Sequence, residues 1–87
     1  MKTLKIWNGR GHGKYDKYHI YVAAYSSKQA CEIIGIACEL GYPISTTEIN
    51  VYYSKGCWGN AMSGIEPTEP CVYVKKEWCN ETPIRIF

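Results

Sequence analysis

The sequence predicts an α+β fold in which a small antiparallel sheet of about four strands carries one main helix on a face. Apolar residues recur at every second position over 18–25, as they do in a strand. They recur at helical spacing over 27–40, and short runs rich in β-branched and aromatic residues lie near both ends of the chain. With 87 residues, we expect a single domain, 1–87, around a small core.

The first two strands are expected to form a hairpin. Residues 3–7 are typical of a strand with Leu4 and Ile6 on one face, and the glycine-rich stretch 8–14 leads to a second strand over 18–25. One face of the second strand should pack in the core, through Ile20, Val22 and Ala24. The other face should be half exposed and aromatic, through His19, Tyr21, Ala23 and Tyr25.

The main helix is expected to begin after a cap at Ser26 or Ser27 and to run to about Leu40. Its solvent-facing stripe contains Lys28, Glu32, Gly35 and Glu39. Its sheet-facing side contains Ala30, Ile33, Ile34 and Ala37. Ile36 lies on an uncovered flank. Gly35 costs about 1 kcal/mol relative to Ala in a helix, so it either permits a close approach or is simply tolerated.

The stretch after the helix has two interpretations. Residues 41–43, Gly-Tyr-Pro, end the helix. Ser45 and Glu48 then form a capping box, whereas 49–53 has strand propensity, and we expect a short second helix. Two closing strands, over 71–75 and 84–87, complete the order ββα(α)ββ.

Charge is unevenly distributed along the chain. Residues 1–20 carry five Lys or Arg against one Asp, a net +4, whereas the rest carries five against seven Glu, a net −2. The total of +2 is too small to imply a nucleic-acid partner by itself.

The five cysteines are expected to be free thiols in a cytoplasmic protein. The start of the chain lacks the apolar run of a signal peptide, and no stretch approaches the ~20 apolar residues that cross a membrane. No Cys-x-x-Cys pair occurs and neither His12 nor His19 has ligand spacing to a cysteine, so we expect no metal and no cofactor. Neither His12 nor Cys57 has an evident catalytic partner, so we expect no enzyme activity.

The run 52–62 places large aromatic side chains, a lysine and a thiol among turn-forming residues. This composition is typical of a recognition loop. The residues that we expect to contact a partner there are Tyr53, Lys55, Trp58 and Asn60. The alternative is that Trp58 packs back onto the sheet as part of the core.

A second candidate group consists of Arg10, His12 and Lys14, which alternate with glycines. We expect them to contact a partner, and the backbone N–H groups between them would suit a phosphate. The spacing matches neither a Walker loop nor a dinucleotide fingerprint. The alternative is a long flexible hairpin loop.

Several short segments resemble small phage and prophage proteins, some of which are anti-CRISPR or related anti-defence inhibitors. The segments are 21–24 (Tyr-Val-Ala-Ala), 53–54, 57–62 (Cys-Trp-Gly-Asn-Ala-Met), 65–67 and 72–73. The resemblance implies a viral protein in the host cytosol that binds and blocks a bacterial defence complex of the CRISPR–Cas type, without catalysis. It assigns no functional residue.

A small nucleic-acid-binding protein is the alternative. Its basic N-terminal loop would attract the backbone, and bases would stack on His19, Tyr21 and Tyr25 of the sheet. A homodimer through the Ile36 flank and the tyrosine-rich sheet face is also open.

Overall fold

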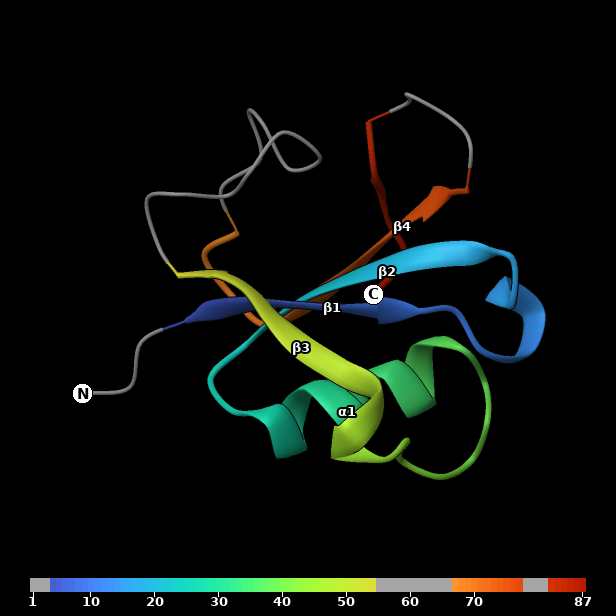
Figure 1. Ribbon diagram of the computed structural model, residues 1–87, viewed down its shortest axis with the longest axis horizontal. Helices are drawn as coiled ribbons and strands as arrows, with labels where there is room; N and C mark the ends of the chain where they lie inside the picture. Colours follow the sequence, from blue (N-terminus) through green and yellow to red (C-terminus); the bar gives the residue numbers. More distant parts are fainter. Residues whose placement is uncertain (1–3, 55–66, 78–81) are drawn as a thin grey trace.

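The computed structural model describes residues 4–54, 67–77 and 82–87. These residues form one antiparallel sheet with a single α-helix on one face, which confirms the α+β prediction (Figure 1). The elements in order are β1 (Lys5–Arg10), η1 (Gly13–Tyr15), β2 (Tyr18–Ala24), α1 (Ser27–Ala37), η2 (Thr46–Glu48), β3 (Ile49–Ser54), β4 (Cys71–Lys76) and β5 (Ile84–Arg85).

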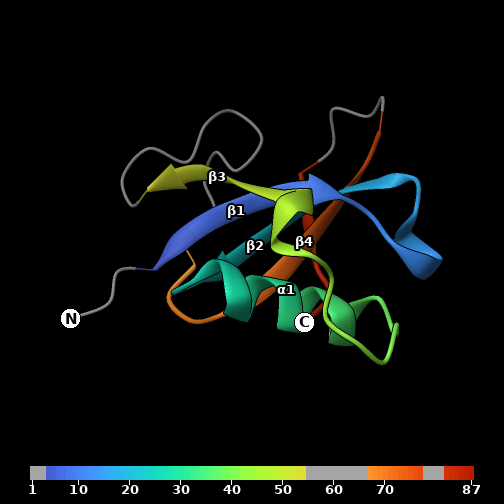
Figure 2. The same cartoon turned by 60° about the horizontal axis from the view of Figure 1, so that its bottom comes forward.

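The sheet has five strands in the order β3-β1-β2-β4-β5, one more than expected. Every neighbouring pair is antiparallel. Figure 2 shows α1 beneath the sheet, against the strands in its middle. The first strand runs from Lys5 to Arg10 rather than over 3–7, because Gly9 and Arg10 stay paired with β2 up to the turn.

The extra strand replaces the second helix that we expected after Ser45. The Ser45 hydroxyl accepts from the Thr47 N–H at 3.3 Å, but the turn closes after the three 3₁₀ residues of η2. Ile49 is already extended, is buried in the core and lies opposite Gly9 of β1. Burial of Ile49 and the strand propensity of 49–53 therefore outweigh the capping signal.

Helix α1 begins as expected, since the Ser26 hydroxyl accepts from the Gln29 N–H at 3.1 Å. It ends at Ala37, three residues before the expected Leu40. Glu39 adopts a left-handed conformation with φ of 59° and donates its N–H to Ile36 O at 3.1 Å. The Leu40 N–H donates to Gly35 O at 2.9 Å, which completes a Schellman motif.

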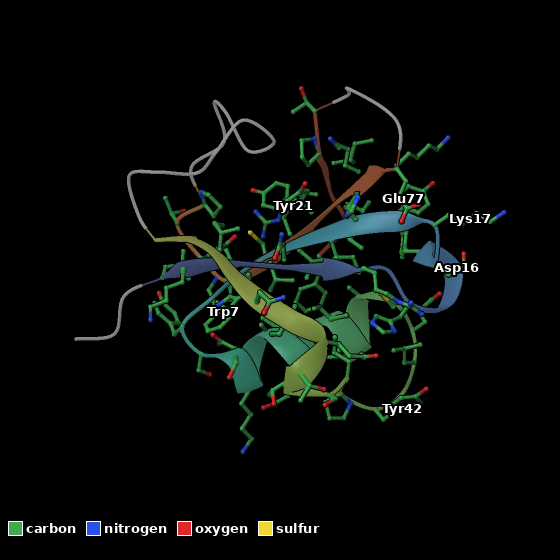
Figure 3. The ribbon with its side chains drawn as sticks, in the orientation of Figure 1. Trp7, Asp16, Lys17, Tyr21, Tyr42 and Glu77 are labelled. Carbon is green, nitrogen blue, oxygen red and sulfur yellow. The ribbon has the colours of Figure 1, made fainter. Side chains whose placement is uncertain are left out.

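The main core lies between α1 and the sheet. It contains Ile20, Val22, Ala24, Ala30, Cys31, Ile33, Ile34, Cys38, Ile44, Ile49, Val72 and Val74. Trp7 packs against it and donates its indole N–H to Ala24 O at 3.2 Å (Figure 3). The core set predicted for the second strand is therefore confirmed.

The other face of β2 differs from the expectation of a half-exposed aromatic face. Tyr21 is only 6% exposed and Ala23 is completely buried. Both belong to a second apolar cluster with Ile6 and Cys71. Ile6 of β1 and Cys71 of β4 lie directly opposite Ala23, so the apolar side chains of both neighbouring strands pack against this face of β2. Only His19 of that face is exposed within the strand.

Candidate functional site

The segment after α1 folds back onto the helix because Gly35 has no side chain. A Cβ atom at Gly35 would overlap the carbonyl oxygen of Tyr42 and would lie 3.1 Å from Pro43 Cα. Beyond this contact, the Ile44 N–H donates to Cys31 O at 3.4 Å and the Ile44 side chain is buried. Gly35 therefore permits the close approach of the chain that follows α1. We call residues 41–44 of this chain the return segment.

The return segment and the helix enclose a surface groove. One depression of about 310 Å³ is lined by Glu32, Gly35, Ile36, Gly41, Tyr42 and Pro43. A second of about 350 Å³ is lined by Lys28, Cys31, Glu32, Pro43, Ile44 and Thr46. Glu32 and Pro43 line both, so the two depressions adjoin. We call them together the helix groove.

The helix groove has unusually exposed apolar walls. Ile36 is 61% exposed and Tyr42 is 64% exposed, although each carries a large side chain. Figure 3 shows Tyr42 at the edge of the molecule, on the side of α1 away from the strands. In the parts of the chain that the structure describes, neither Lys28 nor Glu32 forms an ion pair. The groove thus offers exposed apolar side chains of the kind that protein interfaces bury, with Lys28 and Glu32 as polar neighbours.

The residues of the glycine-rich candidate group do not converge on one point. Arg10 is exposed at the end of β1. Lys14 instead faces the turn that ends α1, where its Nζ lies 3.0 Å from Glu39 Oε2. The hydrogen bond that the Lys14 ammonium donates to the Glu39 carboxylate is the main cause that raises the pKa of Lys14. His12 Nε2 lies 3.5 Å from Glu48 Oε2, and this nitrogen is buried without a hydrogen-bond partner. Two of the three residues therefore face carboxylates.

The glycines of this stretch have packing roles. A Cβ atom on Gly9 would lie 2.8 Å from Glu48 O, and one on Gly13 would lie 2.8 Å from Cys38 O. Gly13 also has a φ of 58°, which side chains disfavour. The Gly11 N–H donates to Tyr18 O at 2.7 Å. The stretch is thus closely packed, rather than the flexible hairpin loop considered as an alternative.

Most of the predicted aromatic recognition loop lies outside the described residues. Lys55, Trp58 and Asn60 belong to the stretch 55–66, for which no structure is described. Tyr53 lies in β3, where its backbone is opposite Ile6 of β1. The contact of these four residues with a partner stays a prediction from the sequence.

The thiols that the structure describes lie in the two apolar clusters. Cys31, Cys38 and Cys71 are free and buried, and burial raises the pKa of each thiol. A thiol with a raised pKa is a poor nucleophile at neutral pH. Within 4–54, 67–77 and 82–87, no three His, Cys, Asp or Glu side chains gather closely enough to hold a metal ion.

Comparison of the chain with protein-family models, with curated proteins and with solved structures finds no match. Among the helices that the structure describes, none is long and apolar enough to cross a membrane. Inference about function therefore rests on this chain's own surfaces.

Sequence reasoning identified one wall of the helix groove and missed the other. Ile36 was expected to lie on an uncovered flank of the helix. Tyr42 was expected only to help end the helix. The Gly-Tyr-Pro run after a glycine-containing helix is the signal that would have placed Tyr42 beside Ile36.

Proposed function

We propose that the protein is a non-enzymatic inhibitor that binds a bacterial defence complex of the CRISPR–Cas type, by protein–protein contact in the host cytosol. The observation that carries this proposal is the exposure of Ile36 and Tyr42 on either side of the helix groove. The resemblance of 21–24, 57–62 and 72–73 to small phage and prophage proteins, some of which are anti-defence inhibitors, supports the choice of partner.

Exposed apolar side chains beside a groove favour a protein partner. Large apolar and aromatic side chains supply most of the binding energy of protein interfaces when a partner removes them from water. Tyr42 offers both a ring and a hydroxyl group, and Pro43 gives the groove a rigid wall. Glu32 lies in the middle of the groove, where it would select a partner residue of positive charge.

The proposal is tested by phage plating on a panel of bacterial strains, each carrying one active CRISPR–Cas system that targets the phage. Expression of the protein should restore plating in at least one strain. The double variant Ile36→Ser/Tyr42→Ser should lose this effect, because it removes both apolar walls. Ile84→Ser is the matched control, since Ile84 is 63% exposed but lies in β5, away from the groove.

A second arm identifies the mode of inhibition. The tagged protein should retain the proteins of the affected system after nuclease treatment, and the double variant should not. Unchanged plating in every strain would contradict the inhibitor function, and full activity of Ile36→Ser/Tyr42→Ser would contradict the role of the groove.

A further inference from the structure

A row of basic side chains crosses three strands of the sheet. Arg10 of β1 lies directly opposite His19 of β2, and His19 lies directly opposite Lys75 of β4. Directly opposed residues of an antiparallel pair have Cβ atoms about 5 Å apart. Neighbouring strands lie about 4.8 Å apart, so the row extends about 10 Å across the sheet. We call these three residues the basic row.

The basic row lies on the face of the sheet away from α1. Side chains alternate along a strand, so His19 shares a face with Tyr21 and Ala23. The intervening Ile20 and Val22 pack in the core with α1. The basic row and the helix groove are therefore on opposite sides of the molecule.

The basic row has no acidic partner among the described residues. Lys14 and Arg85, by contrast, lie 3.0 Å and 2.8 Å from the carboxylates of Glu39 and Glu69. None of the three residues of the row forms an ion pair or a side-chain hydrogen bond in the described parts of the chain. Arg10 and His19 are exposed, and Lys75 is half-buried. The row is therefore available to an anion.

Two acidic residues lie at the same end of the sheet. Glu77 follows β4 and donates its N–H to Lys17 O at 3.3 Å, and Asp16 precedes Lys17 in the turn (Figure 3). Neither carboxylate forms an ion pair with a described residue. Lys17 adds a further positive charge, so this end of the sheet keeps a positive balance. The negative charge of Glu77 should weaken the attraction of the row for an anion. Removal of this charge is therefore expected to strengthen anion binding.

The geometry of the row fits a linear polyanion. A line of cations across a sheet follows the backbone of a single strand, whose negative charges recur at regular intervals. The next row holds Tyr73 opposite Tyr21. Tyr73 is half-buried and offers part of a ring to a base, whereas Tyr21 is buried. No large hydrophobic side chain is exposed within the row, although an acidic protein partner would need an apolar centre to its interface.

We propose that the basic row of Arg10, His19 and Lys75 is a binding site for the phosphate backbone of single-stranded nucleic acid. The site uses a different surface from the helix groove. Loss of nucleic-acid binding and loss of inhibition are therefore separable by substitution.

The test is fluorescence anisotropy of a labelled oligothymidylate of about 15 nucleotides, titrated with the whole protein. The two permanent charges of the row, Arg10 and Lys75, predict a slope of log affinity against log salt of about −1.4. Affinity should then fall about sevenfold between about 50 and 200 mM salt. Arg10→Gln and Lys75→Gln should each remove about half of that slope, and the double variant should abolish binding.

Matched controls separate the row from general positive charge. Lys76→Gln removes the same charge one residue along β4, on the face toward α1, and should leave binding nearly unchanged. Glu77→Gln should strengthen binding. Circular dichroism must show that each variant is folded.

Three outcomes would overturn the proposal. The first is the absence of salt-dependent binding by the wild-type protein. The second is an equal loss in Lys75→Gln and Lys76→Gln, which would indicate binding through net charge alone. The third is displacement of the oligonucleotide by a polyglutamate peptide at equal charge concentration, which would assign the row to an acidic protein surface.

Discussion

The backbone of Tyr42 occupies the space that a side chain on Gly35 would fill. A Cβ atom on Gly35 would overlap Tyr42 O and would also approach Tyr42 C at 2.9 Å. The glycine of α1 thus determines where the return segment lies, and thereby forms one end of the helix groove. A residue that weakens the helix locally is necessary for the surface that we propose to be functional.

Gly35→Ala should therefore destabilise the protein, although alanine is the better helix former. The propensity gain is about 1 kcal/mol. Displacing a packed backbone segment typically costs about 1–3 kcal/mol, and a clash with main-chain atoms lies toward the upper end of that range, so we expect a net loss of about 1–2 kcal/mol. Urea unfolding measures this difference. Ile36→Ala at the exposed neighbouring position is the control and should change stability by less than about 0.5 kcal/mol. An unchanged or stabilised Gly35→Ala would contradict the contact.

Glu39 occupies a position where glycine is usual. Its φ of 59° places an L-residue in the left-handed region at the end of α1, which costs about 1 kcal/mol or more. Its ion pair with Lys14 is exposed and contributes little in return. Glu39→Gly should therefore raise the melting temperature. Glu39→Ala, which loses the ion pair but keeps the Cβ atom, should not raise it, and equal effects of the two substitutions would contradict the backbone argument.

Stability should fall at alkaline pH because burial raises the pKa of four buried or half-buried acidic groups. The affected groups are the thiols of Cys31, Cys38 and Cys71 and the phenol of Tyr73. A folded-state pKa above the unfolded value, here 9.0 for the thiols, contributes stability that is complete below that pH. This contribution is lost as the pH rises through the folded-state pKa. Urea unfolding under reducing conditions from neutral pH upward should show the decline.

The matched variant for the alkaline decline is Cys71→Ala, which removes one ionisable group from the second apolar cluster. It should be less stable than the wild type at neutral pH, and its stability should depend less steeply on pH above about 9. An identical pH dependence in the two proteins would exclude Cys71 as a contributor.

The sequence predicted the elements that depend on local patterns of residues. It did not predict the features that depend on pairing between strands far apart in the chain. The cap at Ser26 and the core positions Ile20 and Val22 follow from capping chemistry and from period-two alternation. The strand that begins at Ile49 forms by pairing with β1. The local capping signal at Ser45 instead favours a helix there. Likewise, Tyr21 packs in a cluster with Ile6 and Cys71, which the pairing of β2 with β1 and β4 brings together.

The basic row likewise could not be predicted from local sequence patterns. Arg10 was expected to act with His12 and Lys14, its neighbours in sequence, but it lies in register with His19 and through it with Lys75. Lys75 is more than 60 positions away in the chain, and only the register of β2 against β4 brings it to this row. Strand register is set by the assembled core, so no local pattern around Arg10 reveals it.

Trp58→Ala tests the recognition loop that the sequence predicts. Trp58 lies outside the described residues, so the prediction rests on its setting among turn-forming residues, three positions after Lys55. If Trp58 contacts the partner, its removal should weaken binding by about 2 kcal/mol or more and leave the melting temperature unchanged. Phage plating on a strain in which the wild-type protein restores plating reports the loss of binding. Thermal unfolding measures the melting temperature.

Trp7→Phe is the matched control for this prediction. Trp7 packs against the main core and donates its indole N–H to Ala24 O at 3.2 Å. Loss of that hydrogen bond should cost about 1 kcal/mol of stability and should leave partner binding intact. Substitution of Trp58 should thus weaken binding without changing stability, and substitution of Trp7 should lower stability without changing binding. A Trp58→Ala protein that unfolds would instead assign Trp58 to the core, and inhibition would then have to depend on the helix groove.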